Sequence, residues 1–159
     1  MLTWSQLERA APEITARGRD LLERFQFVLV GTLTKDGSPR VNPCEAYIID
    51  GHLLLNMMPG SLKALDLLRD PRIYVHSPVT SKDGTDGEFK LAGAASVLAD
   101  VGLRTKLDDL FWQMIQWRPA PDSHYFEVFA QRVAYHRYGE DEVALRWALP
   151  GTRPTSFGN

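Results

Sequence analysis

A candidate phosphate-binding turn lies near residue 60, where an apolar segment passes through Pro59 and Gly60 into a predicted helix. Ser61 is suited to cap that helix, and Gly60 allows the backbone to turn sharply. Lys63 falls in the first helical turn, where a cation opposes the helix dipole by about 0.3–1 kcal/mol. A bound anion removes this conflict, because exposed N–H groups, a hydroxyl and an ammonium group together bind phosphate. An ordinary cap followed by a solvated lysine is the alternative interpretation.

Other side chains that could bind a metal or act in catalysis are scattered along the chain. The histidines lie on different predicted strands without a metal-ligand spacing such as His-x-x-x-His, so we expect no metal site at His52, His76, His124 or His136. Cys44 has no cation beside it in sequence, which favours a buried structural thiol over a nucleophile. The motifs of serine hydrolases, P-loops and dinucleotide-binding folds are absent from the sequence.

Composition places this sequence among ordinary globular proteins. Its 159 residues predict one domain over residues 1–159, with 44% apolar and 24% charged residues. A formal net charge of -2 argues against nucleic acid as the main partner. One cysteine excludes a disulfide within the chain and fits a reducing compartment. No signal peptide or membrane-length apolar run is present, so we expect a cytoplasmic protein without membrane contact.

The first half of the chain predicts helices followed by a β-meander. Residues 1–25 form a helical segment, with a capping box at Thr3-x-x-Gln6 and a second start at Pro12. Two Asp-Gly turns then separate three β-rich runs, which are residues 27–34, 39–49 and 52–57. A short helix over residues 61–69 carries three leucines on one side, namely Leu62, Leu65 and Leu68, and stops before a proline.

The second half predicts further strands and one more helix. Gly93 marks a bulge or a close backbone approach within its strand. The third helix, residues 103–115, is expected to pack on the barrel through Trp112 and Trp117. The predicted strands cover residues 72–77, 89–98, 125–129, 132–138 and 143–149, a polar loop covers 78–87, and a frayed tail covers 150–159. About eight mostly antiparallel strands with peripheral helices favour a mainly β fold, a closed or partly closed barrel.

Several short motifs in this order carry a family resemblance. They are Gly31-Thr32-Leu33, Asp36-Gly37-Ser38-Pro39-Arg40-Val41-Asn42-Pro43, Ser61-x-Lys63, Leu67-Leu68-Arg69-Asp70-Pro71-Arg72, Gly93 and Arg146-Trp147. With this spacing, roughly residues 25–149 resemble the FMN-binding split β-barrel family, which includes pyridoxamine 5'-phosphate oxidase. The resemblance implies a split β-barrel of antiparallel Greek-key type.

The resemblance also implies a set of cofactor-binding residues. The flavin phosphate would be held by Arg40, Ser61 and Lys63, and the isoalloxazine edge would be lined by Val41, Asn42 and Asn56. An FMN phosphate carries nearly two negative charges, which suits a guanidinium fork and a lysine point charge. The alternative for Arg40 is an exposed strand residue, and the alternative cofactor is a deazaflavin.

One departure from the family pattern weakens the oxidase interpretation. The authentic oxidases place a second cation a few residues after the strand arginine, whereas this sequence has Glu45 there. The chain also lacks their C-terminal substrate-binding signature. We therefore do not expect pyridoxamine phosphate oxidation. A haem-degrading relative would need an axial ligand, for which His76 and His136 are the candidates.

The resemblance predicts a flavin-dependent oxidoreductase that moves a hydride to or from a small molecule, with NADH or NADPH as candidate electron donors. Catalytic side chains are not identified. The alternatives are a deazaflavin-dependent reductase, a flavin-binding protein without turnover and an interaction module without cofactor.

We further expect a homodimer, because an eight-stranded barrel of this size cannot enclose a flavin ring. The opposite chain would contribute Lys90, Arg146 and Trp147 to the cofactor site. The apolar residues beside them, which would join the dimer contact, are Phe89, Leu91, Val143 and Leu145. The alternative for these four residues, and for Trp147, is packing in the barrel core.

Overall fold

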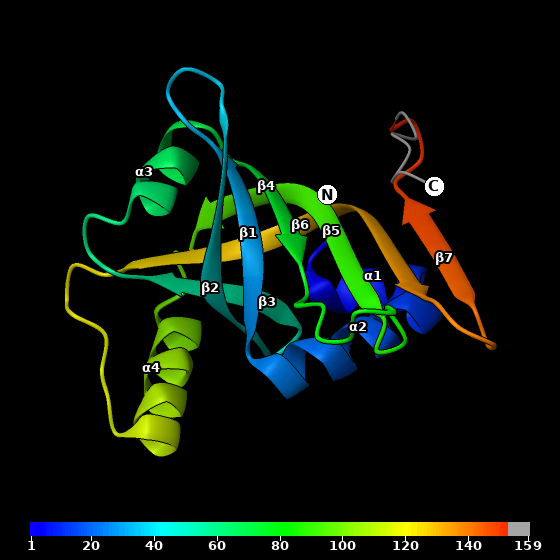
Figure 1. Ribbon diagram of the computed structural model, residues 1–159. Coiled ribbons are helices and arrows are strands. Elements are labelled where there is room, and N and C mark those ends of the chain that lie inside the picture. The colour runs from blue at the N-terminus through cyan, green and yellow to red at the C-terminus, as the bar shows by residue number, and fades with distance from the viewer. Residues whose placement is uncertain (153–159) are drawn as a thin grey trace.

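The computed structural model describes residues 1–152 (Figure 1). Two short helices begin the chain, α1 (Trp4–Ala10) and α2 (Pro12–Phe25). The predicted capping box is present, since the Thr3 hydroxyl accepts a hydrogen bond from the Gln6 amide and the Gln6 side chain accepts one from the Thr3 amide. The predicted second start is also confirmed, because a proline needs no amide partner in the first turn of α2.

Six strands form the barrel in a Greek-key order. The strands β1 (Phe27–Leu33), β2 (Pro39–Ile49) and β3 (His52–Met57) make the predicted antiparallel meander. The next strand, β4 (Arg72–His76), returns beside β1 and pairs with β5 (Glu88–Val97). Three hairpin-connected strands followed by a fourth beside the first define a Greek key. The predicted mainly β split barrel is therefore confirmed.

A single long strand closes the barrel where the sequence predicts two. β6 (His124–Arg137) pairs with β5 along its length and with β3 near its start. β6 runs on through the predicted break with a β-bulge: adjacent Ala92 and Gly93 of β5 pair with Arg132 and Ala130, so Gln131 of β6 is the extra residue. A Cβ atom on Gly93 would lie 1.9 Å from the carbonyl oxygen of Phe129, which confirms the predicted close approach. In the described part of the chain, β7 (Val143–Ala148) is the seventh strand and pairs with β6 outside the barrel.

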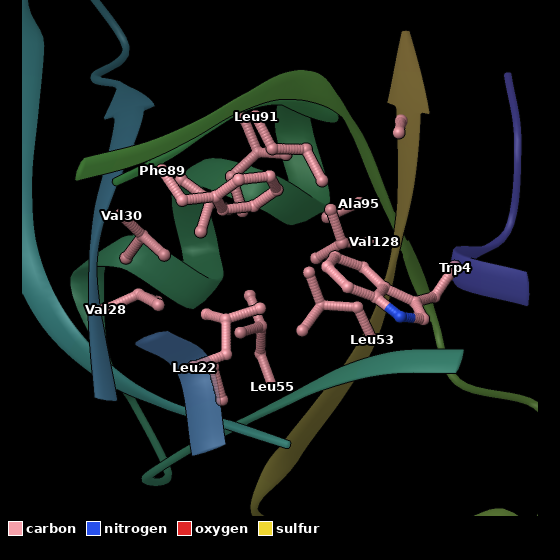
Figure 2. Close-up of a cluster of buried hydrophobic side chains, with 14 of the residues drawn as sticks. Trp4, Leu22, Val28, Val30, Leu53, Leu55, Phe89, Leu91, Ala95 and Val128 are labelled. Atoms are coloured by element: carbon pink, nitrogen blue, oxygen red, sulfur yellow. The ribbon is translucent and has the colours of Figure 1, made fainter. Parts of the chain in front are cut away.

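The main core fills the barrel and extends to α1 and α2. Figure 2 shows apolar side chains from β1, β3, β5 and β6 pointing toward one another. Trp4 of α1 reaches this core and meets the Phe89 ring edge-on at 5.9 Å. Phe89 and Leu91 are fully buried here, and Val143 and Leu145 pack against the same cluster. These four residues therefore belong to or pack against the barrel core, which was the alternative interpretation.

The two remaining helices lie on the other side of the barrel, α3 (Leu62–Arg69) after β3 and α4 (Val101–Ile115) after β5 (Figure 1). α4 packs through a second apolar cluster of Leu103, Leu107 and Phe111 against β3 and β6. The prediction for the helix tryptophans is wrong for Trp112, which is exposed with Arg118 over its ring. Trp117 is also largely exposed, although its ring contacts Phe111 edge-on at 5.4 Å.

α3 faces the barrel with a different side from the one its leucines mark. Leu62, Leu65 and Leu68 are exposed, whereas the residues buried against the barrel are Ala64, Asp66 and Leu67. The helix is thus anchored partly through a buried carboxylate. None of the helices within residues 1–152 is long and apolar enough to cross a membrane. Apart from its first residues, the predicted frayed tail lies outside the described residues.

Candidate functional site

An open cavity of about 470 Å³ lies where β2 and β3 meet the start of α3 and the end of α4. This volume falls in the range of small-molecule sites, roughly 300–1,000 Å³. Its lining is mainly apolar with a few polar groups and consists of Pro43, Cys44, Glu45, Asn56, Met57, Met58, Lys63, Ile115 and Trp117. Three residues singled out from the sequence, Glu45, Asn56 and Lys63, thus meet in one cavity.

Lys63 lies in the first turn of α3 and lines this cavity. Its half-buried side chain forms no ion pair or hydrogen bond with the rest of residues 1–152. Ser61 occupies the N-cap position as predicted, but its hydroxyl makes no capping hydrogen bond. The backbone turns through Gly60, whose φ is 68°, into the Ser61 amide, which donates to the Met58 carbonyl at 3.1 Å. Among the described residues, the Lys63 ammonium and the Ser61 hydroxyl at the start of this helix therefore have no hydrogen-bond partner.

Glu45 shares the cavity with Lys63, although no ion pair joins them. It lies directly opposite Asn56 in the β2–β3 register. Burial raises the pKa of the Glu45 carboxyl, because the charged form loses solvation. The carboxylate that distinguishes this sequence from the family pattern therefore faces the candidate site.

Cys44 and Asn56 form a buried part of the cavity lining. The Cys44 thiol donates to the Asn56 carbonyl at 3.4 Å, and burial raises its pKa to about 12. The thiol is therefore neutral, which agrees with the predicted structural role. The Asn56 side-chain amide donates to the His124 carbonyl at 3.5 Å, so β3 and β6 together orient this amide.

Arg40 does not line the cavity but contacts α3 through Asp66. The Arg40 Nε donates to Asp66 Oδ2 at 2.7 Å, and the Thr32 hydroxyl donates to the same oxygen at 2.9 Å. Arg69 donates to Asp66 Oδ1 at 3.1 Å. Burial alone would raise the pKa of Asp66, which is 4% exposed, but these hydrogen bonds outweigh it and hold that pKa below its ordinary value. Arg40 is thus an ion-paired residue rather than an exposed one, and within residues 1–152 its terminal nitrogens make no hydrogen bond.

The other predicted cofactor-binding residues lie outside the cavity of a single chain. Val41 is 64% exposed on the outer wall of β2, and the Asn42 amide donates to the Val41 carbonyl at 2.6 Å. Lys90 pairs with Glu88 on β5. On β7, Arg146 is exposed, whereas Trp147 packs partly against the main core.

The apolar walls of the cavity were not predicted. They come from Met57 and Met58 at the end of β3 and from Ile115 and Trp117 at the end of α4. The sequence carries a weak signal for them, because apolar residues continue beyond both elements into segments rich in turn residues. It does not show that the two segments meet, since they are far apart along the chain.

A family model for pyridoxamine 5'-phosphate oxidase matches residues 14–137, which include the barrel strands and every residue that lines the cavity. The chain belongs to the pyridoxamine 5'-phosphate oxidase family. No curated protein matches it.

Solved structures of the same fold include proteins with different described roles. A heme binding protein from Mycobacterium smegmatis is 18% identical with a TM-score of 0.65, and the match covers 83% of this chain and 56% of that one, just over half its length. A putative pyridoxamine 5'-phosphate oxidase from Listeria innocua is 16% identical over 74% of this chain and 94% of that one, with a TM-score of 0.62. HutZ, a heme storage protein from Vibrio cholerae, is 12% identical over 76% and 89%, with a TM-score of 0.60.

The histidines of this member of the pyridoxamine 5'-phosphate oxidase family lie apart from the cavity. His52 pairs with Glu127 at 2.6 Å, and His136 pairs with Glu142 at 2.9 Å. His76 lies 3.3 Å from Glu88 on the outer wall. None of the four histidines lines the cavity, and residues 1–152 contain no group of three or more His, Cys, Asp and Glu side chains placed to hold a metal ion.

Proposed function

We propose that this chain is a flavin-dependent oxidoreductase that binds FMN in the cavity at the start of α3. The observation that supports this most directly is Lys63, a half-buried cation without a partner in residues 1–152, at a helix start where anions bind. An FMN phosphate supplies the missing negative charge. The family match agrees with a flavin but does not by itself identify one.

The phosphate would be held by Lys63, the Ser61 hydroxyl and the amides of the first turn of α3. Arg40 would add its terminal nitrogens, because Asp66 engages only the Nε of its guanidinium. Asp66 also fixes α3 against β1 and β2, since its carboxylate binds Thr32 and Arg40 from these strands. The two parts of the phosphate site are thus joined through one buried carboxylate.

The apolar side chains of Met58, Ile115 and Trp117 would cover part of the flavin ring, and Asn56 would supply a polar contact. When bound, the flavin would accept or donate the hydride, and the chain would supply binding and position. Glu45 places a carboxyl where the oxidases have a cation, so we do not propose pyridoxamine phosphate as the substrate. A deazaflavin is the alternative cofactor.

We also propose that a second copy of the chain completes the site. The outer wall of β1 and β2 is mainly apolar, with Phe27 41%, Leu29 38% and Val41 64% exposed, and no helix within residues 1–152 covers it. A second copy would cover this wall and bring Lys90, Arg146 and Trp147 toward the flavin, because a two-fold axis forms two identical sites. These three residues lie outside the cavity of their own chain.

An absorption spectrum of the purified chain, followed by titration with FMN, tests the proposed cofactor. We expect flavin bands in the purified protein or saturable FMN uptake by colourless protein. Oxidation of NADH or NADPH by the loaded protein would then distinguish an oxidoreductase from a flavin-binding protein without turnover. A Soret band in place of flavin bands, or failure to take up FMN and deazaflavin, would contradict the proposal.

A further inference from the structure

A second cavity, of about 300 Å³, lies between α2, the loop of residues 78–87 and the end of β6. It shares no lining residue with the candidate FMN cavity. In Figure 1, α2 lies beneath the barrel beside this loop, whereas α3 and α4 lie on the other side. Three arginines line the second cavity, namely Arg17, Arg24 and Arg137.

Regular secondary structure gathers these cations. Positions 17, 20 and 24 of α2 lie on one face because residues three and four apart are neighbours on a helix. Tyr135 and Arg137 are two residues apart on β6 and therefore project from the same side of that strand. The loop between β4 and β5 supplies Asp86 opposite them. The arrangement thus depends on packed elements rather than on one flexible segment.

Two hydrogen-bond donors in this cavity have no partner in residues 1–152. Tyr135 as a whole is 6% exposed, and its hydroxyl makes no hydrogen bond within the described residues but is not fully enclosed. The Nε of Arg17 is fully enclosed and also lacks an acceptor. The Arg17 guanidinium carbon lies 5.2 Å from the centre of the Tyr135 ring, so the two side chains are in contact. A buried donor without an acceptor, here the Arg17 Nε, costs about 1–3 kcal/mol, and a ligand oxygen that reaches this nitrogen removes that cost.

The arginines are not neutralised by the acids beside them. Asp20 and Asp86 line the same cavity, but neither forms an ion pair with any of the three arginines. Arg17 pairs with Glu13 at 3.2 Å, on the exposed side of α2. Arg137 donates to a backbone carbonyl, that of Asp141, at 3.0 Å. The guanidinium groups therefore retain donors that an oxyanion can use.

We propose that this second cavity binds the phosphate group of a small ligand. One hydroxyl and three guanidinium groups surround the cavity, and a phosphate, with three or four terminal oxygens, can engage more of these donors than a carboxylate with two oxygens. The lining has a formal charge of one positive, from three arginines and two aspartates, which favours an anion. The cavity is larger than a phosphate ion, and the two aspartates can accept from hydroxyl groups of an esterified ligand.

The test is titration of the full chain with inorganic phosphate, measured by isothermal titration calorimetry in every variant and by NMR of the Arg17 side-chain Nε–H in each chain that retains Arg17. We expect a saturable shift with a dissociation constant below about 10 mM. Arg17→Lys keeps the charge but removes Nε, and Tyr135→Phe keeps the ring but removes the hydroxyl. Each change should weaken phosphate binding about tenfold, the effect of losing one hydrogen bond to a charged group.

Two control variants separate this site from the FMN site and from surface charge. Lys63→Ala in the first cavity and Arg9→Gln on the exposed face of α1 should leave the Arg17 shift unchanged. Phosphate binding that does not saturate, that keeps its affinity in both Arg17→Lys and Tyr135→Phe, or that disappears in Lys63→Ala would overturn the proposal. Ribose 5-phosphate identifies the source of the phosphate group: tighter binding than inorganic phosphate supports an esterified ligand, and equal binding supports free phosphate.

Discussion

At the scale of single residues, the candidate FMN cavity combines two opposite charges that do not neutralise each other. Lys63 and Glu45 line the same space without an ion pair, and both are half-buried. Partly buried charges without partners cost free energy, so such groups in a cavity are candidates for a functional site. A ligand phosphate would neutralise the positive charge of Lys63, whereas protonation would remove the negative charge of Glu45.

The Glu45 carboxyl should make folding stability depend on pH. Burial raises its pKa above the value of 4.5 that an unperturbed carboxyl has, so the folded chain binds this proton more tightly than the unfolded chain does. The stability from this proton is complete below the unfolded pKa and is lost as the pH rises through the folded pKa. Glu45→Gln should therefore raise the free energy of unfolding at neutral pH, with a smaller gain in acid.

Urea denaturation of parent and Glu45→Gln between about pH 4 and pH 8 measures this difference. Glu140→Gln, which changes an exposed carboxyl outside the cavity, is the matched control and should give a flat difference. If the curves for parent and Glu45→Gln stay parallel across the range, the carboxyl is not held in a desolvating environment.

At the scale of elements, α3 is positioned by a carboxylate rather than by its leucine stripe. Sequence periodicity identifies the leucines as one face but cannot show that this face is exposed. The anchoring contacts of Asp66 come from Thr32 and Arg40, which are 34 and 26 residues distant in the chain. Such contacts depend on how the strands pair, which no local pattern reveals.

The Asp66 anchor can be tested by Asp66→Asn. The change removes a buried charge that accepts from Thr32, Arg40 and Arg69, and it leaves two arginines without their counterion. We expect a loss of about 3 kcal/mol in the free energy of unfolding, since breaking a buried ion pair typically costs about 3–5 kcal/mol. Asp70→Asn at the end of the same helix should have little effect. An equal loss for the two variants in urea denaturation would contradict the anchoring role.

Local signals explain which elements the sequence predicts well. The capping box at Thr3 and the Asp-Gly turns act through neighbouring residues. At position 93 only glycine fits, because the Phe129 carbonyl occupies the place of a Cβ atom. β6 is different, because residues 130–131 interrupt its apolar pattern where Gln131 forms a bulge, and the strand continues on both sides of it. In the candidate site, Lys63 was identifiable from helix chemistry. The walls of the cavity were not, because Trp117 and Met58 meet only after folding.

At the scale of the whole molecule, the uncovered wall of β1 and β2 predicts a dimer. Light scattering at micromolar concentration should give about twice the chain mass of 17.9 kDa. Leu29→Glu introduces a charge into this wall and should yield a monomer, because burying an unpaired charge opposes association. Val101→Glu changes an exposed apolar residue at the start of α4 and should leave the dimer intact. A monomeric parent that binds FMN stoichiometrically would rule out the shared site.

The most direct test of the central claim compares FMN with riboflavin, which lacks the phosphate. Lys63→Ala should weaken FMN binding by about 1.5–3 kcal/mol, or roughly 10–150-fold, the range for a hydrogen bond to a charged group. Riboflavin binding should change little, and Lys35→Ala in the exposed β1–β2 turn should affect neither ligand. If Lys63→Ala leaves FMN affinity unchanged, or weakens FMN and riboflavin equally, Lys63 does not bind the flavin phosphate and the proposed site is wrong.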